Sequence, residues 1–151
     1  MPTQITNFCC AIIWRMIPPR TGGKIEFLVI DSWSTDPNSG LKTQKQVKFP
    51  GGMQENGESL EQTVTREIKQ ETGLLATNVR KIWHLNVAPD HIKHAFMVNL
   101  EDCRGEMRTG SMNDSTDELG PPYWLDLSTL GRLLYRSHRP AYEAARKLLQ
   151  P

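Results

Sequence analysis

The sequence has no long apolar run, and this absence excludes a membrane-spanning helix. No stretch approaches the ~20 apolar residues needed to cross a bilayer, and the N-terminus lacks the charged and apolar regions of a signal peptide. The charge is nearly balanced, with 18 basic and 17 acidic side chains, so neither a nucleic-acid partner nor a membrane surface is indicated. We therefore expect a cytoplasmic protein.

Cysteine is scarce, and its odd count argues against a disulfide framework. Cys9, Cys10 and Cys103 do not have the spacing of a zinc site. Cys9 and Cys10 are adjacent in an apolar run, so in a strand they would face opposite sides of the sheet. We expect buried, reduced thiols rather than ligands or nucleophiles.

The chain also lacks internal repeats and linkers. Its 151 residues, 38% of them apolar, suit one domain covering residues 1–151. Apolar runs predict strands at residues 8–16, 24–31, 45–49, 79–87, 91–100 and 123–127. Helices are expected from residue 60, over 129–135 with Ser128 as the cap, and from Pro140 onwards. This order indicates an α/β fold, in which a mixed sheet packs between helical layers.

Residues 52–74 combine a glycine turn, a helix start and acids grouped on one face. Ser59 and Gln62 have the spacing of a capping box, so a helix should start directly after Ser59. Gly73 stands where a left-handed C-terminal cap is expected. The segment therefore predicts a helix of about three and a half turns at ~3.6 residues per turn.

Glu67, Gln70 and Glu71 project within one arc of this helix, because each residue advances by ~100°. That arc overlaps an apolar stripe formed by Leu60, Val64 and Ile68. Carboxylates beside a core stripe lose hydration and repel one another unless a cation or a donor compensates. The face therefore looks built for a divalent metal; the alternative is a capped surface helix with clustered acids.

The spacing of these residues resembles the Nudix box. A lead-in of Phe49-Pro50-Gly51-Gly52 precedes it, as is usual in that family. The matching positions are Gly52, Glu58, Arg66-Glu67-Ile68, Glu71 and Gly73-Leu74. One defined position departs from the pattern, because Gln70 stands where the family has Glu. The resemblance implies an α/β/α sandwich with a mixed sheet, and a Mg²⁺ or Mn²⁺ site.

The resemblance also implies roles for single residues. Glu71 matches a principal metal ligand of the family, and Glu67 matches a residue that is ligand or base depending on the member. Arg66 matches an arginine that orients a glutamate through a salt bridge, which suits a planar bidentate donor. Glu58 could be the partner of Arg66 or a further metal ligand.

Four more positions are expected to contribute to the site. Gly51 and Gly52 let the backbone approach metal or phosphate closely. The amide oxygen of Gln70 can coordinate a hard cation but brings no charge, so metal affinity should be lower. Glu118 lies near the end of the polar stretch 101–122, where Nudix enzymes often have an additional acid. It is a candidate base or a solvated loop acid. The stretch itself is expected to be a long, lid-like loop.

Together these features predict a hydrolase that depends on Mg²⁺ or Mn²⁺. By resemblance, it would cleave a phosphoanhydride bond in a nucleoside diphosphate linked to another group. The alternative is a Nudix domain that binds a nucleotide-like ligand as a sensor or regulator without turnover. Because both Glu67 and Glu71 are retained, we favour the enzyme. A monomer or a homodimer is expected.

Overall fold

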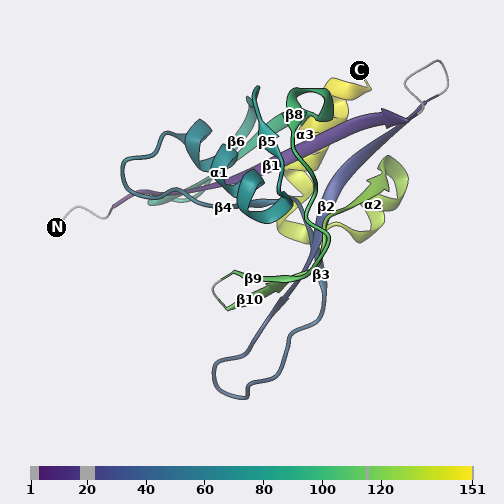
Figure 1. Ribbon diagram of the computed structural model, residues 1–151. Coiled ribbons are helices and arrows are strands. Elements are labelled where there is room, and N and C mark those ends of the chain that lie inside the picture. The colour runs from purple at the N-terminus through teal and green to yellow at the C-terminus, as the bar shows by residue number, and fades with distance from the viewer. Residues whose placement is uncertain (1–3, 18–22, 115, 151) are drawn as a thin grey trace.

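The computed structural model describes residues 4–17, 23–114 and 116–150 (Figure 1). Within them nine strands form one mixed sheet, whose main path runs β6-β7-β1-β2-β10-β9. The strands are β1 (Thr6–Ile17), β2 (Lys24–Ser34), β3 (Gln46–Lys48), β4 (Gly51–Met53), β6 (Arg80–Ala88), β7 (His91–Asn99), β9 (Met112–Asp114), β10 (Asp117–Leu119) and β11 (Tyr123–Asp126). Strands β5 (Leu75–Ala76) and β8 (Cys103–Arg104) pair separately.

Three α-helices and two short 3-10 helices complete the described part of the chain. They are α1 (Leu60–Thr72), α2 (Leu127–Leu133), α3 (Arg139–Leu149), η1 (Leu100–Asp102) and η2 (Arg136–His138). None of the described helices has the length and apolarity needed to cross a membrane.

Strand β1 is the centre of the sheet and makes it mixed. It runs parallel to β7 and antiparallel to both β2 and β4. Because successive side chains of a strand point to opposite faces, β1 supplies two cores. Cys9 packs with the α1 side and Cys10 with the α2 and α3 side, and both thiols are free and buried. Helices α1 and α3 therefore lie on opposite sides of β1 (Figure 1), which confirms the expected α/β/α sandwich.

Helix α1 forms as the sequence predicts. The Ser59 hydroxyl accepts from the Gln62 amide, the Gln62 side chain accepts from the Ser59 amide, and both bonds of the capping box are present. Gly73 ends the helix in the left-handed region, with φ 85°. Val64 and Ile68 are fully buried against the sheet. This local frame fixes which face of α1 carries Glu67 and Glu71.

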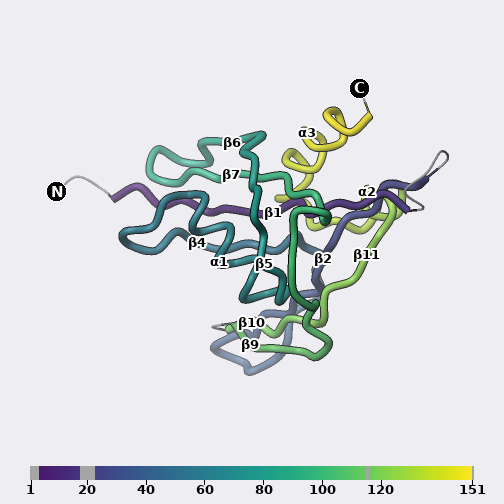
Figure 2. The backbone as a smooth tube through the Cα atoms, turned by 45° about the horizontal axis from the view of Figure 1, so that its top comes forward, coloured from purple at the N-terminus to yellow at the C-terminus, as the bar shows by residue number. Residues whose placement is uncertain are grey.

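The prediction of one long loop over residues 101–122 is wrong, because the segment contains η1, β8, β9 and β10. Its backbone pairs with other strands, and such pairing does not require apolar side chains. In β10, Leu119 pairs with Ser32 and is buried, which extends β2 beyond its predicted end. Figure 2 shows the β9–β10 hairpin at the end of the sheet away from α3.

The second helix starts earlier than predicted. It begins at Leu127 rather than Thr129, because Asp126 and not Ser128 is its cap. The Asp126 carboxylate accepts from the Thr129 amide at 2.8 Å, and Ser128 donates to the same carboxylate oxygen. A carboxylate two residues earlier thus replaces the expected hydroxyl as the cap.

Candidate active site

A cleft of about 690 Å³ opens where the loop before α1, the helix itself and the β9–β10 hairpin meet. Its acidic wall carries Glu67 and Glu71 from α1, with Asp114 and Asp117 from the hairpin. Gly51 and Gly52 of β4, Arg66 and Gln70 also line it. Because this cleft gathers most of the predicted residues, it is the candidate active site.

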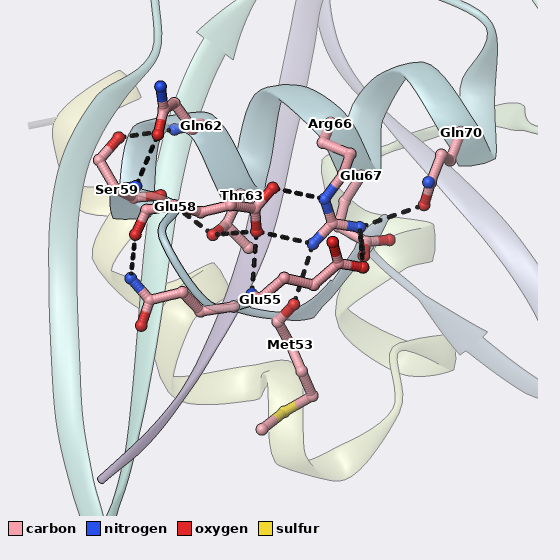
Figure 3. Close-up of polar contacts among 10 residues, drawn as sticks. Met53, Glu55, Glu58, Ser59, Gln62, Thr63, Arg66, Glu67 and Gln70 are labelled. Carbon is pink, nitrogen blue, oxygen red and sulfur yellow. Dashed lines mark hydrogen bonds and ion pairs between the residues drawn. The ribbon is translucent and has the colours of Figure 1, made fainter.

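Arg66 ties the loop before α1 to the acids of the helix (Figure 3). Its guanidinium binds Glu58 in a bidentate pair, with Nε–Oε2 at 2.6 Å and Nη2–Oε1 at 3.0 Å. Nη1 donates to Oε1 of Glu67 at 2.7 Å, and Nη2 donates to the carbonyl oxygen of Met53 at 3.0 Å. Arg66 therefore fixes the Glu67 carboxylate in the cleft.

Glu58 is placed as the partner of Arg66. Its Oε1 also accepts from the Glu55 amide at 2.9 Å and from the Thr63 hydroxyl at 3.0 Å. The hydrogen bonds from Arg66 lower the pKa of Glu58 to about 2. Both oxygens are engaged in these bonds, and Glu58 stands outside the group of acids that face one another in the cleft.

Three carboxylates converge in the cleft. One oxygen each from Glu67, Glu71 and Asp114 lies within 4.8 Å of the others. Glu67 and Glu71 are both 6% exposed, whereas Asp114 is exposed. Oε1 of Glu71 accepts from the Gly51 amide at 2.9 Å. Oε2 of Glu67 is buried and has no hydrogen-bond partner among the described residues.

Glu67 and Glu71 have raised pKa values, because burial penalises their charged forms. Burial raises the pKa of Glu71 to about 8. The hydrogen bond from the Gly51 amide acts in the opposite direction, whereas the neighbouring charges of Glu67 and Asp114 raise this pKa further. Burial also raises the pKa of Glu67, although the hydrogen bond from Arg66 opposes the shift. Two buried carboxylates with raised pKa values, one of them with an unpartnered oxygen, form a group that could hold a cation.

The raised pKa of Glu71 predicts a pH dependence of stability in the metal-free protein. In the unfolded chain Glu71 loses its proton near pH 4.5, whereas the folded protein keeps it until about pH 8. Between these values the folded state binds more protons, so the free energy of unfolding falls by about 1.4 kcal/mol per pH unit from this group. The glutamine of Glu71→Gln does not titrate, so the free energy of unfolding of this variant should lack the part of the decrease that comes from Glu71.

Denaturation of both proteins in EDTA at pH 5 and pH 8 measures the effect. The variant should gain stability relative to the wild type on going from pH 5 to pH 8. The comparison cancels contributions from buried His94 and His138, since both proteins contain them. If the unfolding free energies of the variant and the wild type differed by the same amount at both pH values, the prediction would be contradicted.

The two glycines of β4 permit close approaches between protein groups. A Cβ on Gly52 would lie 2.4 Å from Oε1 of Glu67, and a Cβ on Gly51 would lie 2.4 Å from the carbonyl oxygen of Cys9. Gly52 thus leaves room for the Glu67 carboxylate. Gly51 lets β4 pair with β1, which brings its amide to Glu71.

Gln70 lies at the edge of the cleft. Its side-chain oxygen accepts from Nη1 of Arg66 at 3.3 Å, and the residue is exposed (Figure 3). The same Arg66 nitrogen donates to Glu67. Gln70 therefore binds the same guanidinium nitrogen that orients Glu67.

The hairpin brings Asp114 to the acids and leaves Glu118 elsewhere. In the antiparallel register Asp114 opposes Asp117, while Glu118 opposes Asn113. Directly opposed residues share a face, so the two pairs point to opposite sides. Asp114 and Asp117 line the cleft, whereas Glu118 pairs with Lys42 at a separate hollow. Sequence reasoning missed Asp114, because its partner strand was not recognised.

Arg108 is a second residue that the sequence did not reveal. Its Nε and Nη2 donate to the carbonyl oxygen of Glu71 at 2.9 and 2.7 Å, and Nη2 also donates to Gly120 O at 2.9 Å. Nη1 donates to the Gly110 carbonyl oxygen. Gly110 and Gly120 flank the β9–β10 hairpin. Arg108 thus joins the end of α1 to both ends of the hairpin that carries Asp114.

Removal of the Arg108 guanidinium should leave Asp114 less firmly positioned beside Glu67 and Glu71. Arg108→Ala should raise the Mn²⁺ dissociation constant by about tenfold, the lower end of what supporting groups contribute to metal sites. If Arg108 acts through Asp114, then Arg108→Ala and Asp114→Asn should not be additive in a double-mutant cycle.

Calorimetric titration of Mn²⁺ into the metal-free variants checks this, with Arg104→Ala as the control, because Arg104 is exposed on nearby β8. Full additivity of the two changes, or an equal effect in the control, would count against the positioning role.

Comparisons with known proteins place the chain in a family. The family model described as "NUDIX domain" matches residues 14–148. A curated relative, the "ADP-ribose pyrophosphatase" of Methanocaldococcus jannaschii, is 31% identical over 91 residues, which cover 58% of this chain and 50% of that protein. The match therefore spans half the length of the relative.

Solved structures share the fold at low sequence identity. A mutT/nudix family protein from Listeria innocua aligns with a TM-score of 0.68 at 18% identity, covering 98% of this chain and 96% of that chain. The NUDIX domain of Shewanella oneidensis NrtR, solved in complex with ADP ribose, aligns with a TM-score of 0.64 at 18% identity. That alignment covers 99% of this chain and 91% of the other.

Proposed function

The chain belongs to the Nudix family, and from this premise we propose that it is a metal-dependent pyrophosphohydrolase. The substrate would be a nucleoside diphosphate linked to another group, and the bond cleaved would be a phosphoanhydride. The observation that carries the proposal is the convergence of Glu67, Glu71 and Asp114 in one cleft.

The donor set fits a hard divalent cation. All the converging groups are carboxylates, and Mg²⁺ and Mn²⁺ prefer oxygen ligands. The unpartnered Oε2 of Glu67 is a further observation in favour of an ion at this position. When bound, the metal would neutralise the diphosphate and lower the pKa of water. Glu67, Glu71 and Asp114 would hold it, with Gln70 at the edge of the cleft.

The protein groups would then divide the work of positioning. Arg66 holds Glu67, the Gly51 amide holds Glu71, and Arg108 holds the hairpin that carries Asp114. Asp114 is the exposed member of the group, so it can exchange protons with solvent. We assign to Asp114 the place of the additional acidic residue that the sequence suggested at Glu118.

The second candidate is a ligand-binding domain without turnover. Gln70 favours it, because the amide brings no charge to a position where the family has Glu, and it is engaged by Arg66. The retained acids favour the enzyme, because Glu67, Glu71 and Asp114 together offer the oxygen donors for the metal that hydrolysis would require.

A panel of nucleoside triphosphates, dinucleoside polyphosphates, ADP-ribose and nucleotide sugars tests the proposal. Phosphate-containing products should appear with Mg²⁺ or Mn²⁺ and disappear with EDTA. Tight binding of a nucleotide without product formation, at any metal concentration, would favour the second candidate. Hydrolysis that is insensitive to EDTA would overturn the proposed chemistry.

A further inference from the structure

The cleft has a second wall, which carries cations instead of acids. Lys48 of β3 and Lys93 of β7 line it together with His138 of η2. Both lysines are half-buried, and neither ammonium has an ion-pair or hydrogen-bond partner within the parts of the chain that the structure describes. A half-buried cation without a counter-ion is unfavourable, so an anion bound at this wall would stabilise the two lysines.

The two lysines flank the same imidazole. Nζ of Lys48 lies 5.2 Å from the centre of the Tyr135 ring, and that ring lies 5.9 Å from the ring of His138. On the other side Lys93 pairs with Phe8 in the β1–β7 register, and Phe8 lies 6.1 Å from the same imidazole. Both lysines therefore lie on the cleft side of the same imidazole, and their charges both act on it, although they come from distant parts of the sequence.

His138 can present a proton to this wall without carrying a charge. Its Nδ1 lies 3.2 Å from the Phe49 amide nitrogen, which donates, so the ring proton resides on Nε2. Burial, reinforced by the charges of Lys48 and Lys93, lowers the pKa of His138 to about 3. The residues that line this wall thus include two ammonium groups and a neutral imidazole that carries its proton on Nε2.

The two walls are joined by a short piece of chain. Lys48 lies three residues before Gly51, whose amide donates to Glu71. If the acids and their metal engage the diphosphate that is cleaved, the cationic wall is left facing the group beyond it. A neutral sugar at that position would leave both lysines uncompensated.

We propose that Lys48, Lys93 and His138 bind a further phosphate, so that the preferred substrate is a nucleoside polyphosphate with more than two phosphates in its chain. This inference rests on the proposed function and narrows its substrate class. It disfavours ADP-ribose, which has a diphosphate between two neutral sugars, although a relative of this chain acts on that compound by its name.

Kinetics with two substrates test the inference. The wild type should hydrolyse a nucleoside triphosphate with a higher kcat/KM than ADP-ribose. Lys48→Gln and Lys93→Gln should each lower kcat/KM for the triphosphate by about tenfold, since hydrogen bonds to charged groups are of that strength. The same changes should leave kcat/KM for ADP-ribose within about threefold, and Lys93→Arg should restore most of the loss.

Lys147→Gln is the matched control, because it removes the same charge from an exposed site on α3 outside the cleft. Equal losses for the two substrates in the lysine variants would overturn the inference and leave the proposed hydrolysis standing. A preference of the wild type for ADP-ribose would also overturn it.

If no substrate is turned over, the proposed function fails but the inference is still tested. A nonhydrolysable triphosphate and ADP-ribose, each titrated calorimetrically with Mg²⁺, should bind the wild type with different affinities. Lys48→Gln and Lys93→Gln should weaken only the triphosphate, again by about tenfold. Unchanged triphosphate binding in both variants would refute the anion site.

Discussion

Glu71→Gln should lower kcat by at least about 10²-fold, which is the range seen when one preorganised charge-stabilising group is removed. The change keeps the shape of the side chain and an oxygen that can accept from the Gly51 amide. What it removes is one negative charge from the three converging carboxylates. The loss should therefore appear in turnover and metal affinity, whereas the free energy of unfolding should not decrease.

Steady-state rates over a range of Mg²⁺ concentrations measure this effect. Glu61→Gln is a suitable control, because Glu61 is exposed in the first turn of the same helix. Full activity of Glu71→Gln at saturating metal would show that Glu71 has no role in the reaction.

Gly52→Ala is expected to be almost as damaging, for a steric reason. The new Cβ would lie 2.4 Å from Oε1 and 2.8 Å from Oε2 of Glu67, distances that force the carboxylate to move. Displacement of a catalytic group by about 1 Å can cost about 10²-fold in rate. Because the clash is with a side chain, the fold should persist while kcat/KM falls by about that factor.

Gly110→Ala separates this effect from a general intolerance of alanine. Nothing lies within 4 Å of the position that its Cβ would take, so activity should be retained. Gly51→Ala should instead impair folding, because its Cβ would meet the β1 backbone. If Gly52→Ala turned over substrate normally, the placement of Glu67 would be incorrect.

The sequence by itself determined the helix that carries the acids. The signals at Ser59, Gln62 and Gly73 act over three or four residues, and such local interactions form in the same way in any fold that accepts the helix. The apolar stripe then fixed which face turns inward, and with it the burial of Glu67 and Glu71. Alternation in the first strand likewise predicted that Cys9 and Cys10 face opposite cores.

Polar segments were predicted less well, because their structure depends on partners far away in the chain. Residues 112–119 have too few apolar side chains to be recognised as strands, yet β10 forms because the end of β2 offers backbone groups for pairing. The register of this hairpin, and not its composition, puts Asp114 in the cleft and Glu118 outside it.

Tertiary structure alone decided which distant side chains meet. The backbone carbonyls that Arg108 bridges become neighbours only when the hairpin docks on the end of α1. Lys48, Lys93 and His138 come from three separate elements, and no spacing in the sequence relates them. Local hydrogen bonds and apolar periodicity depend on residues that are close in the sequence, so the sequence predicts them. A cleft forms only when strands and helices pack in one particular order, so its second wall could be recognised only in the folded chain.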